Sequence, residues 1–218
     1  SAVLGNSTVT GRLAHLGFHD YGGAPSPDSR FSSWLTETAA NCSSCDDGGT
    51  PSQGEWNFAR DSTSLELQDI LNGFPSVLIY DGYDSYYFHH NSFGFWGLLA
   101  YDQTTGIYTP RSRFYTNAQI NAFISPGSVR IGQSDSISAV ESAAFYNSTT
   151  GKVTIVGYNG GGSSITISGQ LLNVPAISSL AIYITNSSVN LQKGADVPVT
   201  SGTFSVTIPA DTFFSLTN

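Results

Sequence analysis

The order of secondary structure in the first 125 residues limits the fold more than any other feature of the chain. Leu13–His19 and Phe31–Glu37 have the composition of β-strands, and Pro75–Tyr80 is a third, uniformly apolar run. A helical pattern of about ten residues, Ser62–Leu71, separates the second run from the third. This order is typical of parallel βα units, in which an apolar strand is buried on both faces. Three such strands cannot close a barrel, so the sequence predicts a fragment of an α/β fold.

Turn and capping residues set the expected ends of the helices. Asp61 or Ser62 is the expected N-cap of the first helix, and Gly73 is its expected stop. A second helix is expected from about Ser112 to Ile124, before Pro126-Gly127. Its expected apolar positions are Phe114, Ala118, Ile120 and Phe123.

From Ser128 onward, short runs rich in β-branched residues alternate with Gly, Asn and Ser turns, one of them at Asn159–Gly162. Closely spaced strands of this kind are typical of an antiparallel sandwich. The sequence therefore predicts an α/β part over residues 1–125 and an all-β sandwich over residues 126–218. The expected strands are Val129–Ile131, Ala143–Tyr146, Lys152–Tyr158, Ser164–Ser168, Leu180–Thr185 and Thr203–Ile208.

Charge and hydropathy exclude several classes of partner. Of the 218 residues only 11% are charged, and the net charge is −8. An acidic chain is a poor partner for nucleic acid or for an anionic membrane surface. The sequence also contains no apolar run near the ~20 residues that a membrane-spanning helix needs.

The two cysteines form a Cys-x-x-Cys pair, Cys42 and Cys45, within a segment rich in Ser, Asp and Gly. A redox-active pair normally opens a helix, and zinc would need a second pair of ligands at suitable spacing. A structural disulfide is therefore favoured over both alternatives, and neither a metal ion nor a cofactor is expected. Glycosylation is expected at four Asn-x-Ser/Thr sequons, Asn6, Asn41, Asn147 and Asn186.

The disulfide, the sequons and the scarcity of lysine favour a secreted, extracellular protein. The first residues, Ser1–Leu4, have neither the basic region nor the long apolar region of a signal peptide. For a secreted protein this indicates processing, and we expect the chain to start at an internal cleavage point.

The segment Ser32–Thr38 carries the strongest chemical signal. Glu37 ends a predicted parallel strand, which is where barrel enzymes build their active sites. Trp34 offers a ring for stacking on a sugar, and a carboxylate can attack an anomeric carbon. The alternative is that Glu37 only begins a loop.

Other polar and aromatic side chains gather around the same strand ends. His15 and His19 are four residues apart and face one side of a strand, but a third metal ligand is not evident, so a polar site or a core position is favoured. Trp56 and Trp96 are subsite walls or core residues, with core favoured for Trp96. The densest cluster follows the third strand and is either a sugar-binding loop or a packed loop with surface tyrosines. It consists of Asp81, Tyr83, Asp84, Tyr86, Tyr87, His89 and His90.

Several blocks, in order along the chain, resemble a known enzyme family. Gly17–Gly22, Trp34–Glu37 and Val77–Tyr83 are similar to barrel strands six, seven and eight of clan A glycoside hydrolases, most closely of family 30. Arg113–Ile131 resembles the last barrel helix and its exit into a side β-sandwich. Val206–Leu216 resembles the final sandwich strands. The resemblance implies the C-terminal part of a (β/α)8 barrel followed by a sandwich.

The resemblance also implies roles for particular residues. Glu37 corresponds to the nucleophile of a retaining hydrolase, and His19 and Tyr21 on strand six would shape the subsite around it. Substrate-binding roles are expected for these two residues and for Trp34, Asp81, Tyr83, His89 and His90. The acid/base glutamate of the clan ends strand four, which this chain lacks.

The main hypothesis is therefore a retaining glycoside hydrolase that acts on a cell-wall polysaccharide or oligosaccharide. An isolated half-barrel would expose two strand edges, so an N-terminal half is expected as a separate associated chain. Alternatively, the residues belong to a longer protein. The rival functions are a non-catalytic carbohydrate-binding protein and a structural protein whose βα part docks a partner.

Overall fold

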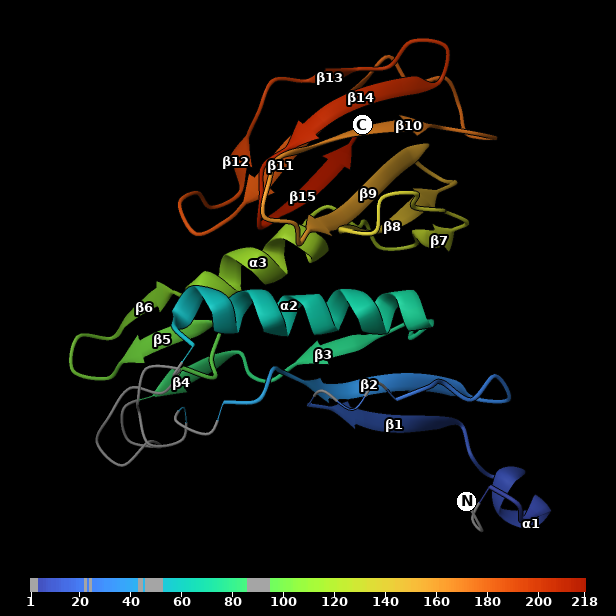
Figure 1. Ribbon diagram of the computed structural model, residues 1–218. Helices are drawn as coiled ribbons and strands as arrows, with labels where there is room; N and C mark the ends of the chain where they lie inside the picture. Colours follow the sequence, from blue (N-terminus) through green and yellow to red (C-terminus); the bar gives the residue numbers. More distant parts are fainter. Residues whose placement is uncertain (1–3, 22, 24, 43–44, 46–52, 86–94) are drawn as a thin grey trace.

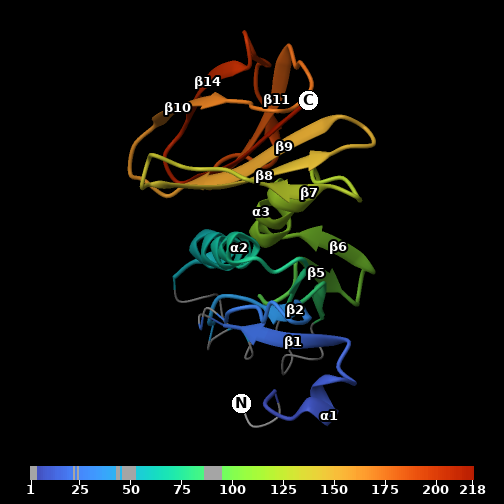
Figure 2. The same ribbon diagram turned by 90° about the vertical axis from the view of Figure 1, so that its right-hand side faces the viewer.

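The protein is built in layers, as the computed structural model shows for residues 4–21, 23, 25–42, 45, 53–85 and 95–218. A small parallel sheet, β1–β3, forms one outer layer, and a β-sandwich forms the other side of the molecule (Figures 1 and 2). Helices α2 and α3 lie between them. No helix in these described ranges combines the length and the apolar character needed to cross a membrane.

The parallel sheet confirms the predicted strands with small shifts in their ends. Its strands are β1 (His15–Asp20), β2 (Ser32–Thr38) and β3 (Val77–Ile79), paired in that order and in parallel. A short helix, α1 (Ser7–Thr10), precedes β1. In this chain by itself the third strand is not buried on both faces, since Leu78 is 48% exposed. The sheet is covered by α2 on one face only, and its other face is open in the described part of the chain.

Helix α2 (Glu55–Asn72) is longer than predicted. It begins seven residues before Ser62, so Asp61 and Ser62 lie inside the helix and neither is its N-cap. Sequence reasoning missed this start because the N-cap is Gly54, which has no side chain to mark it. The predicted stop is confirmed: Gly73 has φ 101°, a left-handed conformation that favours glycine.

A second small sheet that the sequence did not predict follows β3. It consists of β4 (Tyr83–Ser85), β5 (Leu99–Asp102) and β6 (Ile107–Pro110). Strand β4 pairs with β5 in parallel, and β5 and β6 form an antiparallel hairpin. This sheet lies beyond the carboxyl ends of β1–β3, at the same end of the molecule (Figure 1).

Helix α3 (Ser112–Asn121) begins at the predicted residue but buries a different face. Its fully buried side chains are Arg113, Thr116, Gln119 and Ile120. Of the expected apolar positions, only Ile120 is fully buried, and Phe114 and Ala118 are half-buried. A hydropathy pattern cannot reveal this face, because three of its four side chains are polar and find their partners in other elements.

The C-terminal part is an antiparallel sandwich, as predicted. One sheet has the order β12-β11-β15-β9-β8-β7, with β13 paired to β11, and the other consists of β10 and β14. The strands β12, β13 and β15 were not among the six expected from the alternation of strands and turns. The bounds are β7 (Val129–Ile131), β8 (Val140–Asn147), β9 (Lys152–Asn159), β10 (Ile165–Gln170), β11 (Ser179–Thr185), β12 (Gln192–Lys193), β13 (Val197–Pro198), β14 (Thr203–Ile208) and β15 (Thr212–Thr217).

Apolar contacts and a buried amide join the sandwich to the helices. Leu67 of α2 and Ile120 of α3 share one apolar cluster with Phe145 and Val156 of the sandwich. Gln119, which is 0% exposed, donates to Tyr183 O (3.1 Å) and to Ser215 Oγ (2.8 Å), and its Oε1 accepts from Thr185 Oγ1 (2.7 Å). The predicted division at residues 125 and 126 falls between α3 and β7.

We expect Gln119→Leu to lower the free energy of unfolding by about 2–4 kcal/mol, because buried partners on β11 and β15 lose their hydrogen bonds. The midpoint of urea unfolding measures this loss. The matched control is Gln170→Leu, at an exposed glutamine that ends β10, and it should change the midpoint little. Equal effects of the two substitutions would contradict the role given to the buried amide.

Candidate active site

Glu37 lies near the carboxyl end of β2, where a shift in the pairing register brings it beside His19. The two strands pair one-to-one up to Phe18 and Leu35, and the next pair is His19 with Glu37. Thr36 is passed over, and its hydroxyl donates to Phe18 O (3.0 Å). Such an extra residue redirects the side chains that follow it, and bulges of this kind occur often beside active sites.

Two side chains from the end of β1 contact the Glu37 carboxylate. The phenol of Tyr21 donates a short hydrogen bond to Glu37 Oε1, and His19 Nδ1 lies 3.7 Å from the same oxygen. Burial, followed by the hydrogen bond to Glu37, raises the pKa of Tyr21 above its ordinary value. The phenol therefore stays protonated and remains a donor to a carboxylate that is itself only 31% exposed.

Trp96 packs behind Tyr21 and confirms the preference for a core position, since it is 8% exposed. Its ring is edge-on to Tyr21 at 6.4 Å, to Tyr80 at 5.8 Å and to Phe58 at 5.7 Å between centroids. The aromatic donor to Glu37 thus rests on a buried aromatic cluster. Trp56 donates its indole N–H to Asp211 Oδ2 (2.8 Å), on the sandwich side of α2.

Arg113 is a residue that sequence reasoning did not single out for this site. Its guanidinium is 2% exposed and donates to the carbonyl oxygens of Trp96 and of Tyr80 (2.9 Å for the latter). It also lies 5.0 Å from the centroid of the Phe58 ring. An arginine in a helix usually signals a solvated surface, and no pattern in the sequence marks this one as buried.

Trp34 and His15 lie on the open face of the sheet, nearer the amino ends of β2 and β1 than Glu37 is. Their rings stack at 4.5 Å, and Trp34 Nε1 donates to Ser32 Oγ (2.9 Å). His15 covers one face of the indole, which leaves at most the other face for the predicted sugar contact. Among the described residues, no group of three or more His, Cys, Asp or Glu side chains could hold a metal ion.

The remaining predicted substrate contacts follow β3. Asp81 is joined through its backbone to the Trp96 segment, with Asp81 N donating to Trp96 O (3.3 Å). Tyr83 starts β4 and packs against Tyr101 and Tyr108. His89 and His90 lie outside the described residues, so their role stays a prediction.

The Cys42–Cys45 disulfide is confirmed. Both residues pack in the same buried cluster as Phe58 and Trp96, so the bridge closes the segment after β2 over the aromatic cluster behind Tyr21.

The four sequons differ in how their amides are placed. Asn6 and Asn41 are exposed, and Asn186 is half-buried and donates to Thr212 Oγ1 (3.3 Å). Asn147 is 4% exposed, and its amide nitrogen donates to Pro126 O (3.0 Å). A glycan on that nitrogen would remove this hydrogen bond. Glycosylation at the four sequons stays a prediction.

Comparison with solved structures gives the fold a family context. The chain superposes on family 30 xylanase C of Talaromyces cellulolyticus with a TM-score of 0.77, at 25% identity over 99% of this chain and 48% of that one. The family 30 subfamily 8 xylanase of Clostridium acetobutylicum gives 0.76, at 18% identity over 99% and 51%. A family 30 endoxylanase of Clostridium papyrosolvens gives 0.71, at 20% identity over 99% and 51%.

The chain has the fold of the C-terminal part of a family 30 glycoside hydrolase. It spans about half the length of the solved structures that it matches. No protein-family model and no curated protein matches the sequence.

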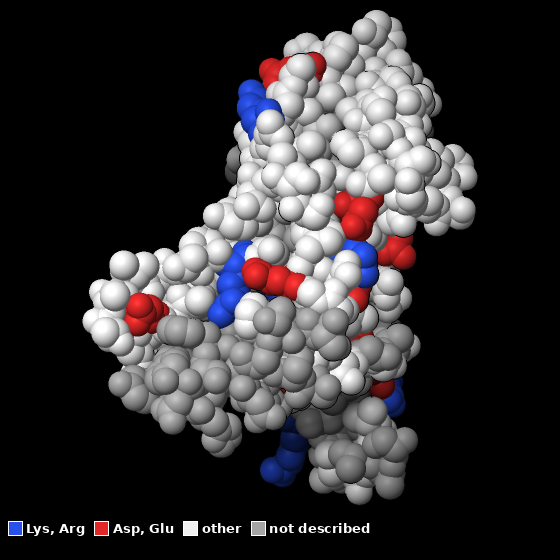
Figure 3. Space-filling model, turned by 60° about the vertical axis from the view of Figure 1, so that its left-hand side comes forward, with Lys and Arg blue, Asp and Glu red and all other residues white. Residues whose placement is uncertain are grey.

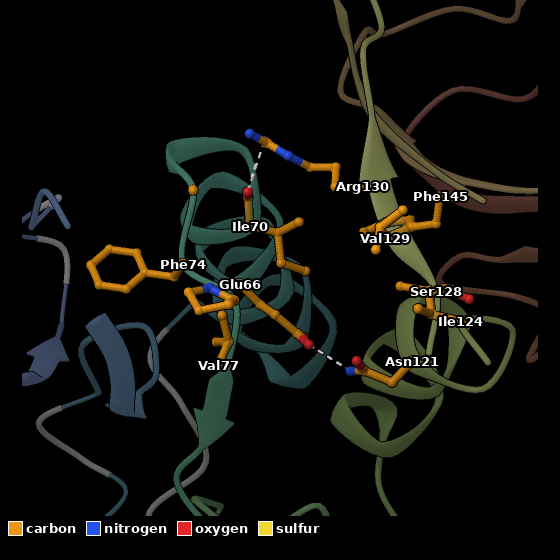
Figure 4. A pocket seen from close by; sticks show the side chains of 12 residues that line it. Glu66, Ile70, Phe74, Val77, Asn121, Ile124, Ser128, Val129, Arg130 and Phe145 are labelled. Atoms are coloured by element: carbon orange, nitrogen blue, oxygen red, sulfur yellow. Dashed lines mark hydrogen bonds between the residues drawn. The ribbon is translucent and has the colours of Figure 1, made fainter. Parts of the chain in front are cut away.

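A cavity of about 430 Å³ lies away from Glu37 in this family 30-like chain. It opens between the end of α2, the start of β3 and strand β7 (Figure 4). In barrel enzymes the amino ends of the strands serve stability and the carboxyl ends serve catalysis. The cavity is therefore not the active site, and none of its lining residues was a predicted site residue. They include Glu66, Ile70, Phe74, Val77, Asn121, Ile124, Arg130 and Phe145.

Two buried acidic groups lie on α2, on the side of the parallel sheet that this helix covers. Asp69 of α2 is hydrogen-bonded to Asp20, and burial together with the charge of Asp20 raises the pKa of Asp69 to about 7. Burial likewise raises the pKa of Glu66 to about 7, although Asn121 and Asn117 donate to its carboxylate. Both carboxyls thus keep their proton to a higher pH in the folded chain than in the unfolded chain.

The stability of the fold should therefore depend on pH in a defined direction. A carboxyl whose pKa is raised by folding stabilises the fold below its unfolded pKa of ~4, and this contribution is lost as pH rises through the folded pKa. We expect the melting temperature to fall between pH 5 and pH 8. Asp69→Asn should flatten this dependence, whereas Asp196→Asn, at an exposed ion pair with Lys193, should leave it unchanged. A profile that Asp69→Asn does not alter would contradict the assignment.

Proposed function

We propose that this chain supplies the nucleophile of a retaining glycoside hydrolase, and that Glu37 is that nucleophile. The observation that carries the proposal is the carboxylate of Glu37 near the end of a parallel strand, contacted by Tyr21 and His19, in a chain with a family 30 fold. The fold of the chain and the place of Glu37 near a strand end support this proposal.

The reaction would proceed in two displacements. A carboxylate oxygen of Glu37 forms a bond to the anomeric carbon while the glycosidic bond breaks, and an acid donates a proton to the departing oxygen. Water then attacks the glycosyl-enzyme, the same acid/base group takes its proton, and the Glu37 carboxylate is released. Tyr21 and His19 would hold the carboxylate in position through both steps.

The acid/base group would come from residues outside this chain. Retention needs a second carboxyl about 5 Å from the nucleophile. The other three glutamates have different roles or positions. Glu55 accepts from the backbone of Ser112 (2.9 Å), Glu66 is buried behind the sheet, and Glu141 lies on β8 of the sandwich. Asp81 is the weaker alternative within the chain.

The open face of β1–β3 supports a barrel completed by further strands. Trp34 and Leu78 on this face are 39% and 48% exposed, and in a closed barrel such positions fill the interior. We propose that an N-terminal half of the barrel, on a separate associated chain or elsewhere in the same polypeptide, covers them. The substrate we propose is a neutral β-linked polysaccharide such as xylan, the substrate named by the matched xylanases, and the disulfide favours a secreted protein.

Glu37→Gln tests the proposed function directly. In the complete barrel we expect kcat/KM for xylan to fall at least about 1000-fold, because the amide cannot act as the nucleophile. Glu141→Gln, the same substitution in the sandwich, should retain activity. Full activity after Glu37→Gln would exclude Glu37 as the nucleophile. If no complete barrel hydrolyses xylan or another polysaccharide, a carbohydrate-binding protein becomes the better interpretation.

Tyr21→Phe tests the hydrogen bond to the nucleophile. Loss of a hydrogen bond to a charged group costs about 1.5–3 kcal/mol, so we expect kcat/KM to fall about 10- to 100-fold. The comparison is Tyr146→Phe, which removes a hydroxyl from β8 and should leave kcat/KM unchanged. Steady-state kinetics on one substrate would measure both variants. A Tyr21→Phe enzyme with unchanged kcat/KM would show that the phenol does not contribute.

A further inference from the structure

Three tyrosines share one face of the sheet beyond the strand ends. Tyr101 of β5 and Tyr108 of β6 are directly opposite each other, and their rings stack at 4.5 Å between centroids. Tyr83 of β4 lies nearly perpendicular to both rings, with its centroid 6.0 Å from each. The equal distances place Tyr83 beside the edges of the stacked pair, so the three rings form one continuous cluster, the tyrosine platform.

The tyrosine platform is not part of the core. Tyr83 is 50% exposed and Tyr108 is 51% exposed. Within the described residues, the three hydroxyl groups make no hydrogen bond. Exposed apolar clusters of this kind mark sites of interaction more often than sites of packing.

The hairpin that carries two of the rings is fixed before any ligand arrives. The Asp102 carboxylate accepts from Thr104 N (2.8 Å) and from Thr105 Oγ1 (2.8 Å) across the turn. Gly106 closes the turn with φ 72°, a conformation that favours glycine. A surface that is already ordered loses little entropy on binding, and tyrosine offers a large contact area with only two rotatable bonds.

The charges around the platform indicate a neutral ligand. The nearby Asp102 carboxylate is used by the turn, and the Arg111 guanidinium lies 4.1 Å from the centroid of the Phe95 ring. In Figure 3 the protruding part on the left, where this hairpin lies, is mostly uncharged, and the charged side chains of this face gather mainly nearer its middle. The C–H face of a pyranose matches an uncharged aromatic ring, and its hydroxyl groups match phenols that have no hydrogen-bond partner among the described residues.

We propose that Tyr83, Tyr101 and Tyr108 bind a neutral polysaccharide chain, apart from the residues that contact Glu37. The platform lies at the end of the molecule where β1–β3 present their carboxyl ends (Figure 1), so a chain bound there would be held near the catalytic carboxylate. This inference rests on the proposed function for the class of ligand, and its test does not need catalysis.

The experiment measures binding of soluble xylan to the complete barrel in a Glu37→Gln background, by affinity electrophoresis over a series of xylan concentrations. We expect Tyr108→Ala to raise the dissociation constant about fivefold or more. Tyr108→Phe should bind more strongly than Tyr108→Ala, because it keeps the ring. Ile107→Ala is the matched control, since Ile107 is 58% exposed on the same strand and points to the opposite face of the sheet. Melting temperatures of all variants test whether they fold.

The outcomes separate the platform from the proposed function. If Tyr108→Ala is folded and binds xylan as tightly as its parent, or if Ile107→Ala weakens binding equally, the platform proposal fails. The role of Glu37 as nucleophile is tested separately, by measuring hydrolysis with the unsubstituted barrel. If that role fails, the comparison of xylan binding between the variants is still valid. Absence of xylan binding in the parent, with binding also absent for β-1,6-glucan and arabinogalactan, would overturn the platform as a polysaccharide site.

Discussion

The buried polar side chains of α3 connect the two halves of the structure. Gln119 bonds to β11 and β15 of the sandwich, and six residues earlier Arg113 bonds to the carbonyls of Tyr80 and Trp96. A buried donor without a partner costs more than a satisfied one contributes, so each of these side chains requires its partners to be in place. The helix thereby ties the orientation of the sandwich to the aromatic cluster behind Tyr21. The position of the phenol that contacts Glu37 depends on that cluster.

The sequence was informative where local chemistry decides the structure. Gly73 marked the end of α2, the Cys42–Cys45 spacing marked the disulfide, and alternation marked most sandwich strands. Sequence reasoning failed where partners distant in the chain decide the structure. Glycine at the N-cap hid the first turns of α2, and Arg113 and Gln119 could not be recognised as buried before their partners were known. The β4–β6 sheet escaped notice because its strands have only three or four residues each.

The sequence predicted only part of the candidate site, because local strand ends mark some of its residues and contacts between distant residues place the others. Glu37 and its neighbours on β1 follow from strand ends, since parallel strands bring their carboxyl ends to one edge. The ring contacts of Tyr83 with Tyr101 and Tyr108 join residues up to 25 positions apart in the chain and depend on the pairing of three short strands. Trp34 shows the opposite case: its place on the open face was predictable, but the stacking of His15 on its ring was not.

The register shift between β1 and β2 also bears on how this scaffold tolerates change. Because Thr36 is passed over in the pairing, the side on which Glu37 emerges is set by one extra residue rather than by strand alternation alone. In a regular pairing of the same residues, Glu37 would lie two positions after Leu35 and would point to the same buried side, toward α2. The length of β2 therefore matters as much as the identity of its residues, and a library intended to reshape the site would do better to vary side chains than to allow insertions or deletions.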